Sequence, residues 1–429
     1  MNLLYANDRA GKYPASYYAA TAQPLDPFRP AMGDISCDVC VIGGGYSGLS
    51  AALHLAKAGY DVVLLDAQRV GFGASGRNGG QVGTGQRIGQ DTLEGIVGKN
   101  QARALWDLSL DSVQLVRNLI ADHDIDCGWT DGIIEANHRE KNVPEDHEYA
   151  EKLQNEYGYD KIRAVGKDEM RSLVGSRAYY GGTLDIGSGH IHPLRYALGL
   201  ARAAQAAGVR IFEQSRVTAV AENGNVATQD ADIKSKYTIL GCNGYLGALN
   251  PSVAQRVMPI NNFIVATEPL SDPRSIIRDN HAVADSKFVI NYFRLSEDNR
   301  LLFGGGESYG YTFPRNIEAT VRKPMLQIFP QLKDTGIDYA WGGTLGITMN
   351  RMPHFARVSD TVLSVSGYSG HGVAMATLGG KLAAQAVAGQ AERFDLFANV
   401  PSPRFPGGAG LRTPLLVLAM LWYSMRDRL

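Results

Sequence analysis

The hydrophobic pattern near the start of the chain changes from a continuous apolar run to a helical spacing and back again. The stretch divides into a strand, a glycine turn, a helix and a second strand: CDVCVI (37–42), GGGYSG (43–48), LSAALHLAKAG (49–59) and YDVVLLD (60–66). In the helical part, Leu49, Ala52, Leu53 and Ala56 recur three or four positions apart and share one face. The helix stops at Gly59, a residue typical of helix ends. The pattern predicts one βαβ unit.

Similar elements return further along the chain. Residues 192–220 predict a helix and a strand, 237–247 a strand ending in a glycine turn, and 361–389 a strand, a glycine turn and a helix. Between them, residues 91–156 are helix-like and charged, and 251–340 contain short β-like runs. GGG at 304–306 is not followed by a helical pattern, so we expect a β-turn there.

This order predicts an α/β fold in which a Rossmann-type, dinucleotide-binding domain is interrupted twice. The insertions form an interleaved α+β domain on a mixed or antiparallel sheet. The predicted boundaries are 36–95, 188–250 and 341–392 for the first domain, 96–187 and 251–340 for the second, and extensions at 1–35 and 393–429.

Composition excludes several kinds of partner. A chain of 429 residues suggests two or three domains, and 45% hydrophobic with 20% charged residues is ordinary for a globular protein. The 42 basic and 43 acidic residues nearly cancel, so neither nucleic acid nor an anionic membrane is indicated as a partner. The first residues do not resemble a signal peptide, which predicts a cytoplasmic protein.

Two further segments have competing interpretations. Cys37 and Cys40 form C-x-x-C, but an extended strand would separate their Cα atoms by roughly 10 Å, beyond the about 7 Å limit for a disulfide. We expect buried thiols rather than a redox pair. The apolar run Leu415 to Tyr423 is too short to span a bilayer. It predicts a terminal helix packed on the protein or in a homo-oligomer interface, with a membrane-surface anchor as the alternative.

The first glycine turn carries a dinucleotide-binding signature. Gly43, Gly45 and Gly48 form G-x-G-x-x-G between a strand and a helix, and Asp66 ends the next strand. Such glycines let the backbone approach a pyrophosphate at the helix N-terminus, and the acid accepts hydrogen bonds from the adenosine ribose. The alternative is a glycine turn in another kind of parallel sheet. After Asp66 the chain enters GFGASGRNGGQVGTGQ (71–86), which favours FAD over NAD because glycines permit close approach to a flat ligand.

These motifs resemble a known family. CDVCVIGGGYSGLSAALHLAKAGYDVVLLDA, VGFGASGRNGGQ, GHIHPL and GYSGHGVAMATLGGKLAA are similar to segments of the D-amino acid oxidase and glycine oxidase superfamily of FAD enzymes. SYYAAT, YFRLSEDNRLLFGGG, RMPHFAR and AERFDLFANVPSPRFPGG further resemble a branch that oxidises γ-glutamylated diamines. The likeness covers nearly the whole chain, and it implies that the interleaved α+β domain is the substrate domain.

The resemblance implies which residues contact FAD. For the ADP part they are Gly43, Gly45, Tyr46, Ser47, Gly48, Asp66, Ala67 and Val217. For the pyrophosphate and flavin they are Gly73, Ala74, Ser75, Gly76, Arg77, Asn78, Gly79, Gly80 and Gln81. For the flavin pyrimidine ring they are Gly370, His371, Gly372, Val373, Ala374 and Met375. We expect Arg77 to offset negative charge on the pyrophosphate or the reduced flavin.

Two departures from relatives refine this expectation. Relatives with covalent flavin carry a cysteine where this chain has Leu345, and no cysteine follows Cys242, so we predict non-covalent FAD. Glycine-oxidase-like relatives bind the substrate carboxylate with an arginine in W-x-G-L-R-P, whereas this chain reads WGGTL at 341–345. An amine whose reacting carbon bears no carboxylate is therefore favoured, although Arg351 is a possible replacement.

The resemblance implies an amine oxidase. Hydride would pass from the amine's α-carbon to flavin N5, water would hydrolyse the imine to aldehyde and ammonia, and O2 would be reduced to H2O2. Pocket candidates are Tyr292, Trp341, Tyr368 and His371, whereas His192 suits a structural role. The alternatives are an amino acid or N-methyl amine dehydrogenase or oxidase of the glycine, sarcosine or D-amino acid type that uses a quinone or carrier, and a non-catalytic flavin-binding protein.

Overall fold

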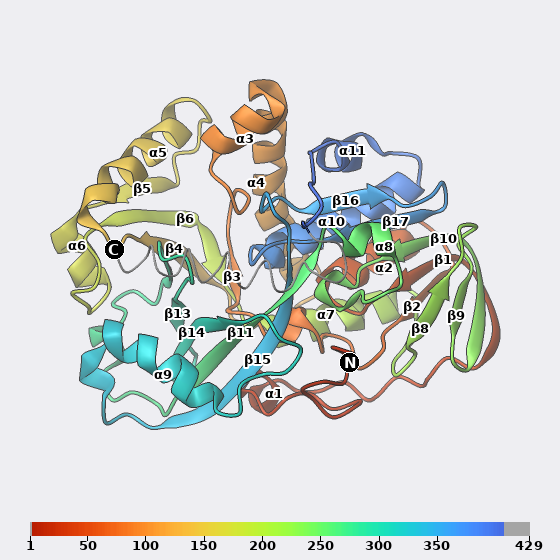
Figure 1. The fold of residues 1–429 in the computed structure, drawn as a ribbon, viewed down its shortest axis with the longest axis horizontal. Coiled ribbons are helices and arrows are strands. Elements are labelled where there is room, and N and C mark those ends of the chain that lie inside the picture. Colours follow the sequence, from red (N-terminus) through yellow and green to blue (C-terminus); the bar gives the residue numbers. More distant parts are fainter. Residues whose placement is uncertain (1, 407–429) are drawn as a thin grey trace.

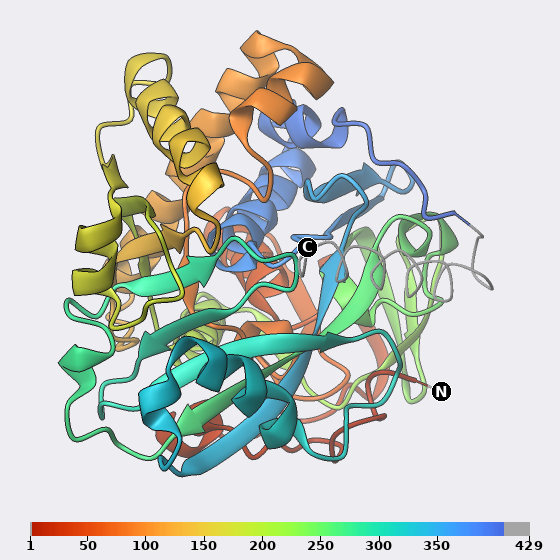
Figure 2. The same cartoon turned by 60° about the vertical axis from the view of Figure 1, so that its left-hand side comes forward.

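Two β-sheets organise the chain, of which the computed structural model describes residues 2–406. In two views, α3 (Gln90–Val97), α4 (Lys99–Asp122) and α5 (Val143–Asn155) lie on one side of the molecule and α9 (Ile317–Ile328) on the opposite side (Figure 1, Figure 2). None of the helices in the described part is long and apolar enough to cross a membrane.

The first sheet has a parallel centre. Its main strand order is β16-β17-β10-β1-β2-β7, with an antiparallel edge at β16 and a β8–β9 hairpin that pairs with β10. The strands are β1 (Gly33–Ile42), β2 (Val62–Leu65), β7 (Arg210–Phe212), β8 (Val217–Val220), β9 (Val226–Thr228), β10 (Ala231–Leu240), β16 (His354–Arg357) and β17 (Val362–Ser366). β2 is buried at every residue, as a parallel strand covered on both faces should be.

Four helices form a large core with this sheet. α2 (Tyr46–Lys57) packs against α7 (Pro193–Ala206) and α10 (Gly372–Val387), and α10 also contacts α4. Leu49 and Leu53, predicted to share one helix face, are both fully buried. The strand, turn, helix and strand predicted for residues 37–66 are therefore present, and the α/β class is confirmed.

The second sheet is mostly antiparallel. Its order is β15-β11-β14-β13-β12-β4-β6-β3, with β5 added on β6 and one parallel pair, β12 with β4. The strands are β3 (Gln81–Val82), β4 (Thr130–Ala136), β5 (Ile162–Val165), β6 (Gly182–His190), β11 (Met258–Thr267), β12 (Ala282–Asp285), β13 (Tyr292–Leu295), β14 (Leu301–Ser308) and β15 (Ile337–Ile347). Because β15 belongs to this sheet, the predicted domain boundary at residue 341 falls inside a strand.

The glycine triplet at 304–306 lies within β14, so the predicted β-turn is wrong. Gly304 pairs with Ile264 of β11 and with Tyr292 of β13 in the middle of the sheet. A Cβ atom on Gly304 would lie 2.1 Å from Cζ of Tyr292. Glycine is needed there because the tyrosine ring crosses the strand, a long-range contact that leaves no local signal.

The four cysteines are free thiols, and Cys37 and Cys40 are buried in β1 as expected. Burial raises the pKa of Cys37 to about 11. The predicted C-terminal helix, Leu415 to Tyr423, lies outside the described residues. The remaining described helices are α1 (Tyr17–Thr21), α6 (Lys167–Leu173), α8 (Pro251–Ala254) and α11 (Glu392–Ala398).

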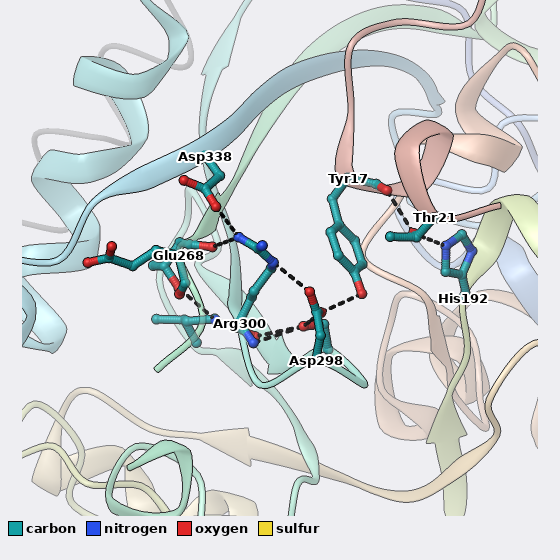
Figure 3. A network of polar contacts seen from close by, with 10 residues as sticks. Tyr17, Thr21, His192, Glu268, Asp298, Arg300 and Asp338 are labelled. Carbon is teal, nitrogen blue, oxygen red and sulfur yellow. Dashed lines mark hydrogen bonds and ion pairs between the residues drawn. The ribbon is translucent and has the colours of Figure 1, made fainter. Parts of the chain in front are cut away.

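The N-terminal segment connects the two sheets. Tyr17 of α1 donates a hydrogen bond of 2.7 Å to Asp298, which also accepts one of 2.6 Å from Nε of Arg300 in the β13–β14 hairpin (Figure 3). On the other side, the hydroxyl of Thr21 lies 3.0 Å from Nε2 of His192. His192 is the N-cap of α7, accepting from the Arg195 amide at 3.2 Å. This supports the structural role expected for His192.

Candidate active site

One large cavity, of about 530 Å³, opens where the parallel strands of the first sheet end. Gly43 follows β1, Asp66 follows β2, Gly241 follows β10, and Gly370 lies just after β17. Open α/β sheets bind ligands at this carboxyl edge. We call this part the first-sheet end of the cavity. The second-sheet end is lined from β4, β11, β12, β13, β14 and β15.

The turn before α2 forms a phosphate-sized cradle. Gly43 has a φ of +107°, and a Cβ atom on Gly48 would lie 1.8 Å from the Gly43 carbonyl oxygen. α2 has no side-chain N-cap and no acidic residue in its first turn, while Gly45, Tyr46 and Ser47 line the cavity. The Tyr46 amide donates to Oγ of Ser75 at 3.0 Å, and the helix N-terminus presents its positive dipole end to the cavity, which fits a pyrophosphate.

Asp66 is positioned by two backbone amides. Gly44 donates to Oδ2 and Gln68 to Oδ1, each at 2.7 Å. Burial raises the pKa of Asp66, and these two N–H groups oppose that effect. A carboxylate has about four acceptor sites, so capacity remains for hydroxyls of a ribose. Ala67 and Val217 line the same part of the cavity.

Arg77 is buried and already ion-paired, which revises its expected role. Nη1 lies 2.8 Å from Oδ2 of Asp8 and donates to Gly342 O, and Nε donates to Phe72 O at 2.7 Å. The residue is 3% exposed. Nη2 has no partner among the described residues. The charge is therefore neutralised by the N-terminal segment, and Nη2 is itself buried rather than presented to the cavity.

Most of the remaining glycine-rich segment faces the cavity. The lining residues are Gly73, Ala74, Ser75, Asn78, Gly79 and Gln81. Gly48, Gly76 and Gly80 do not line it: Gly48 packs under the first turn of α2, Gly76 against Gly71, and Gly80 against Ile191. The segment is thus a folded wall between the two sheets rather than a linker.

A second helix N-terminus meets the cavity at α10. Gly370, His371, Gly372 and Val373 line it, whereas Ala374 and Met375 are buried in helix packing and do not. Nε2 of His371 donates to the carbonyl of Gly83 at 3.1 Å. Burial lowers the pKa of His371 to about 4, so the ring is neutral at pH 7. Its Nε2 proton is already used, and the α10 amides are the better donors to a cofactor.

The predicted aromatic pocket residues separate into two groups. Tyr292 lines the cavity and donates to Oδ1 of Asn262 at 2.5 Å, and Tyr368 lines it with its hydroxyl 2.6 Å from Oγ of Ser47. Trp341 does not line the cavity. Its indole donates to the carbonyl of Arg77 at 3.1 Å and its ring packs edge-on against Tyr18. Trp341 is therefore a packing residue that lies behind the residues lining the cavity.

The sequence interpretation missed most of the charged residues of the second-sheet end. They are Arg87, Glu135, Lys287, Glu307 and Arg351, of which only Arg351 had been considered. The Glu135 side chain faces the cavity on one side and is enclosed by protein on the others. This burial raises the pKa of Glu135 to about 7. These residues come from separate elements, so no spacing along the chain marks them.

The family model for FAD dependent oxidoreductases, named DAO, matches residues 38–386. The chain belongs to this DAO family. The resemblance recognised from the sequence is confirmed, as are the predicted FAD cofactor and the oxidoreductase class.

Full-length relatives of this DAO protein include two bacterial oxidoreductases. The chain is 42% identical to the gamma-glutamylputrescine oxidoreductase of Escherichia coli K12, over 97% of this chain and 99% of that protein. It is 41% identical to the probable oxidoreductase OrdL of Rhizobium meliloti, over 96% of this chain and 97% of that protein.

Solved structures show the same fold. Glycine oxidase from Geobacillus kaustophilus matches with a TM-score of 0.69 at 20% identity, covering 83% of this chain and 95% of that chain. L-proline dehydrogenase from P. horikoshii matches with a TM-score of 0.68 at 21% identity, covering 85% and 94%.

The cavity of this DAO protein fits FAD. Two uncapped helix N-termini, of α2 and α10, meet one cavity at separate points, as a dinucleotide with a distant flavin ring requires. Asp66 and Val217 would hold the adenosine, the α2 turn and Ser75 the pyrophosphate, and residues 370–373 the flavin. Leu345 lines the second-sheet end.

Proposed function

We propose that this protein oxidises the primary amine of a γ-glutamylated diamine, with γ-glutamylputrescine as the first candidate. The observation that carries the proposal is the 42% identity with the gamma-glutamylputrescine oxidoreductase of E. coli along almost the full length of both chains. The substrate loses one hydrogen from the α-carbon and one from the amine nitrogen, which leaves an imine. Water then hydrolyses the imine to aldehyde and ammonia. Bound FAD supplies the electron-accepting chemistry.

The apolar part of the second-sheet end, lined from β11, β13 and β15, suits a neutral amine. Leu345 and Ile347 of β15 and Ile260 of β11 contribute apolar surface, and Tyr292 adds an aromatic ring. Such a wall disfavours the ammonium form, because desolvation lowers the pKa of an amine. The His371 ring is neutral and donates a hydrogen bond to the Gly83 carbonyl, so it does not repel the fraction of the substrate amine that is still protonated. We propose O2 as the acceptor, giving H2O2.

A second candidate substrate is an amine that carries its carboxylate on the reacting carbon, such as glycine or sarcosine. Arg351 lines the cavity six positions after Leu345 and is the observation in its favour. In that case the electron acceptor could equally be a quinone or a carrier. Leu345 itself makes no ion pair with a carboxylate, which is why the γ-glutamylated amine ranks first.

The test is a substrate comparison on purified, FAD-loaded protein. We expect γ-glutamylputrescine to bleach the flavin absorption band at about 450 nm under anaerobic conditions. In air it should yield aldehyde, ammonia and H2O2. Sarcosine, glycine and D-alanine serve as the comparison set. Bleaching by one of these but not by γ-glutamylputrescine would overturn the proposal. Slow reoxidation on mixing with O2 would instead reject O2 as the acceptor.

A further inference from the structure

Three charged side chains at the second-sheet end face the cavity without a protein partner. Arg87 follows β3, Glu135 lies on β4 and Arg351 follows β15, and all three line the cavity. Within residues 2–406, none of them has a side-chain hydrogen bond or ion pair. Arginines elsewhere in the protein interior do: Arg69 pairs with Glu213 at 2.8 Å and Arg77 with Asp8 at 2.8 Å. Unpaired charges on a cavity wall indicate a charged ligand.

These side chains surround one space. Burial raises the pKa of Glu135 and of Glu307, and the positive charge of Arg87 opposes that rise. Burial, and after it the charge of Arg87, lower the pKa of Arg351. The geometric basis is that all four side chains line the same cavity. Glu307 offsets part of the repulsion between the two guanidinium groups, and an anionic ligand beside them would offset more of it.

Glu135 and Glu307 are the acids that line the second-sheet end, and Glu135 is the one that accepts no hydrogen bond within residues 2–406. Two neighbouring acids are already well bonded: Asp185 accepts from Tyr159 at 2.5 Å and Thr84 at 2.8 Å, and Asp285 accepts twice from Asn291, at 2.7 and 2.9 Å. Glu307 accepts from Tyr309 at 2.7 Å. Glu135 has none of these bonds, and its exposed surface is the cavity wall.

We propose that the second-sheet end binds the free α-amino acid group of a γ-glutamyl substrate, with the α-carboxylate on Arg87 and Arg351 and the α-ammonium on Glu135. This inference rests on the proposed function and specifies how its substrate is recognised. A γ-glutamyl amide keeps both α-groups free at the end remote from the reacting amine. A carboxylate on two arginines matches the bidentate geometry that guanidinium groups favour.

The arrangement also discriminates against an unmodified diamine. Putrescine offers a second ammonium group and no anion, so it would leave the two guanidinium groups unneutralised. Lys287, which also lines this end, adds a further positive charge. A substrate that carries a carboxylate and an ammonium group on one carbon therefore fits where a simple dication does not.

The inference is tested with three amides of putrescine that share one reacting amine. γ-Glutamylputrescine has both α-groups, N-glutarylputrescine lacks the ammonium, and N-(4-aminobutanoyl)putrescine lacks the carboxylate. We expect Arg87→Gln to raise the KM at least about tenfold for the two substrates with a carboxylate, and less than about twofold for the third. Glu135→Gln should instead affect only the two substrates with an ammonium group.

Arg202→Gln is the matched control, because Arg202 is exposed on α7 and does not line the cavity. FAD content and melting temperature of each variant verify folding. If wild-type protein oxidises γ-glutamylputrescine but each variant loses the same factor on all three amides, or none, the inference is overturned and the proposed function stands. If wild-type protein oxidises none of the amides, the proposed function falls and the inference falls with it.

Discussion

Arg77 and Arg87 lie ten positions apart on the same glycine-rich stretch, yet the fold uses their charges differently. Arg77 is enclosed and neutralised by Asp8, whereas Arg87 is exposed to the cavity without a protein partner. Local sequence does not distinguish them, because the partner of Arg77 is 69 residues away. The dinucleotide glycines, by contrast, were predictable, since their spacing alone produces the turn before α2.

Glu135 should give the KM a pH dependence. Its pKa is raised to about 7 by burial, so the carboxylate becomes protonated as the pH falls below 7 and can no longer pair with an ammonium group. We expect the KM for γ-glutamylputrescine to rise between pH 7.5 and 5.5 by up to about tenfold per pH unit below the pKa. The charges that face Glu135 are those of Arg87, Asp146, Asp285 and Asp185.

The control for this pH profile is N-glutarylputrescine, which has no ammonium to pair. Its KM should not rise as the pH falls from 7.5 to 5.5, and the KM of Glu135→Gln should not rise there with any of the three amides. A rise that persists in Glu135→Gln would assign the titration to another group.

At the level of elements, the N-terminus of α2 depends on close backbone packing. The Gly48 Cα lies so near the Gly43 carbonyl, directly after β1, that a Cβ atom would meet that oxygen at 1.8 Å. The sequence pattern predicted this element correctly, because the constraint is local. It did not predict Gly304 of β14, whose constraint comes from Tyr292 on the neighbouring strand.

Gly48→Ala should therefore abolish stable FAD binding and lower the free energy of unfolding by at least about 2 kcal/mol. Gly95→Ala is the matched control: Gly95 lies in α3, and a Cβ atom there meets nothing within 4 Å. Alanine at that helix position should be neutral or stabilising by roughly 0.5–1 kcal/mol. Urea unfolding and the flavin-to-protein absorbance ratio measure both effects. Equal behaviour of the two variants would contradict this account.

At the level of the whole molecule, the first sheet was largely predictable and the second was not. The βαβ pattern fixes neighbouring parallel strands, since right-handed crossovers leave few alternatives. The second sheet joins β4 to β12 and β3 to β6, pairings between distant segments that no short-range pattern encodes. The charged residues of the cavity depend on those pairings, which explains why Glu135 and Glu307 were missed.

The cavity as a whole predicts that FAD is held without a covalent bond. Among the described residues that line it, Cys242 is the one cysteine, and it follows β10 at the first-sheet end with Sγ 3.5 Å from the Ile42 carbonyl. Leu345 occupies the second-sheet end. Acid precipitation should release all flavin into the supernatant. A flavin mass retained on the denatured chain would contradict the prediction.

The division of the cavity between two sheets has a consequence for how substrate preference can diverge. The cofactor contacts expected at Gly43, Asp66 and Gly370 follow strands of the first sheet, whereas Arg87, Glu135 and Leu345 lie on or beside strands of the second. Substitutions on the second sheet can therefore change the substrate preference while leaving these cofactor contacts in place. An enzyme for a new amine would be sought by randomising β4, β14 and the end of β15.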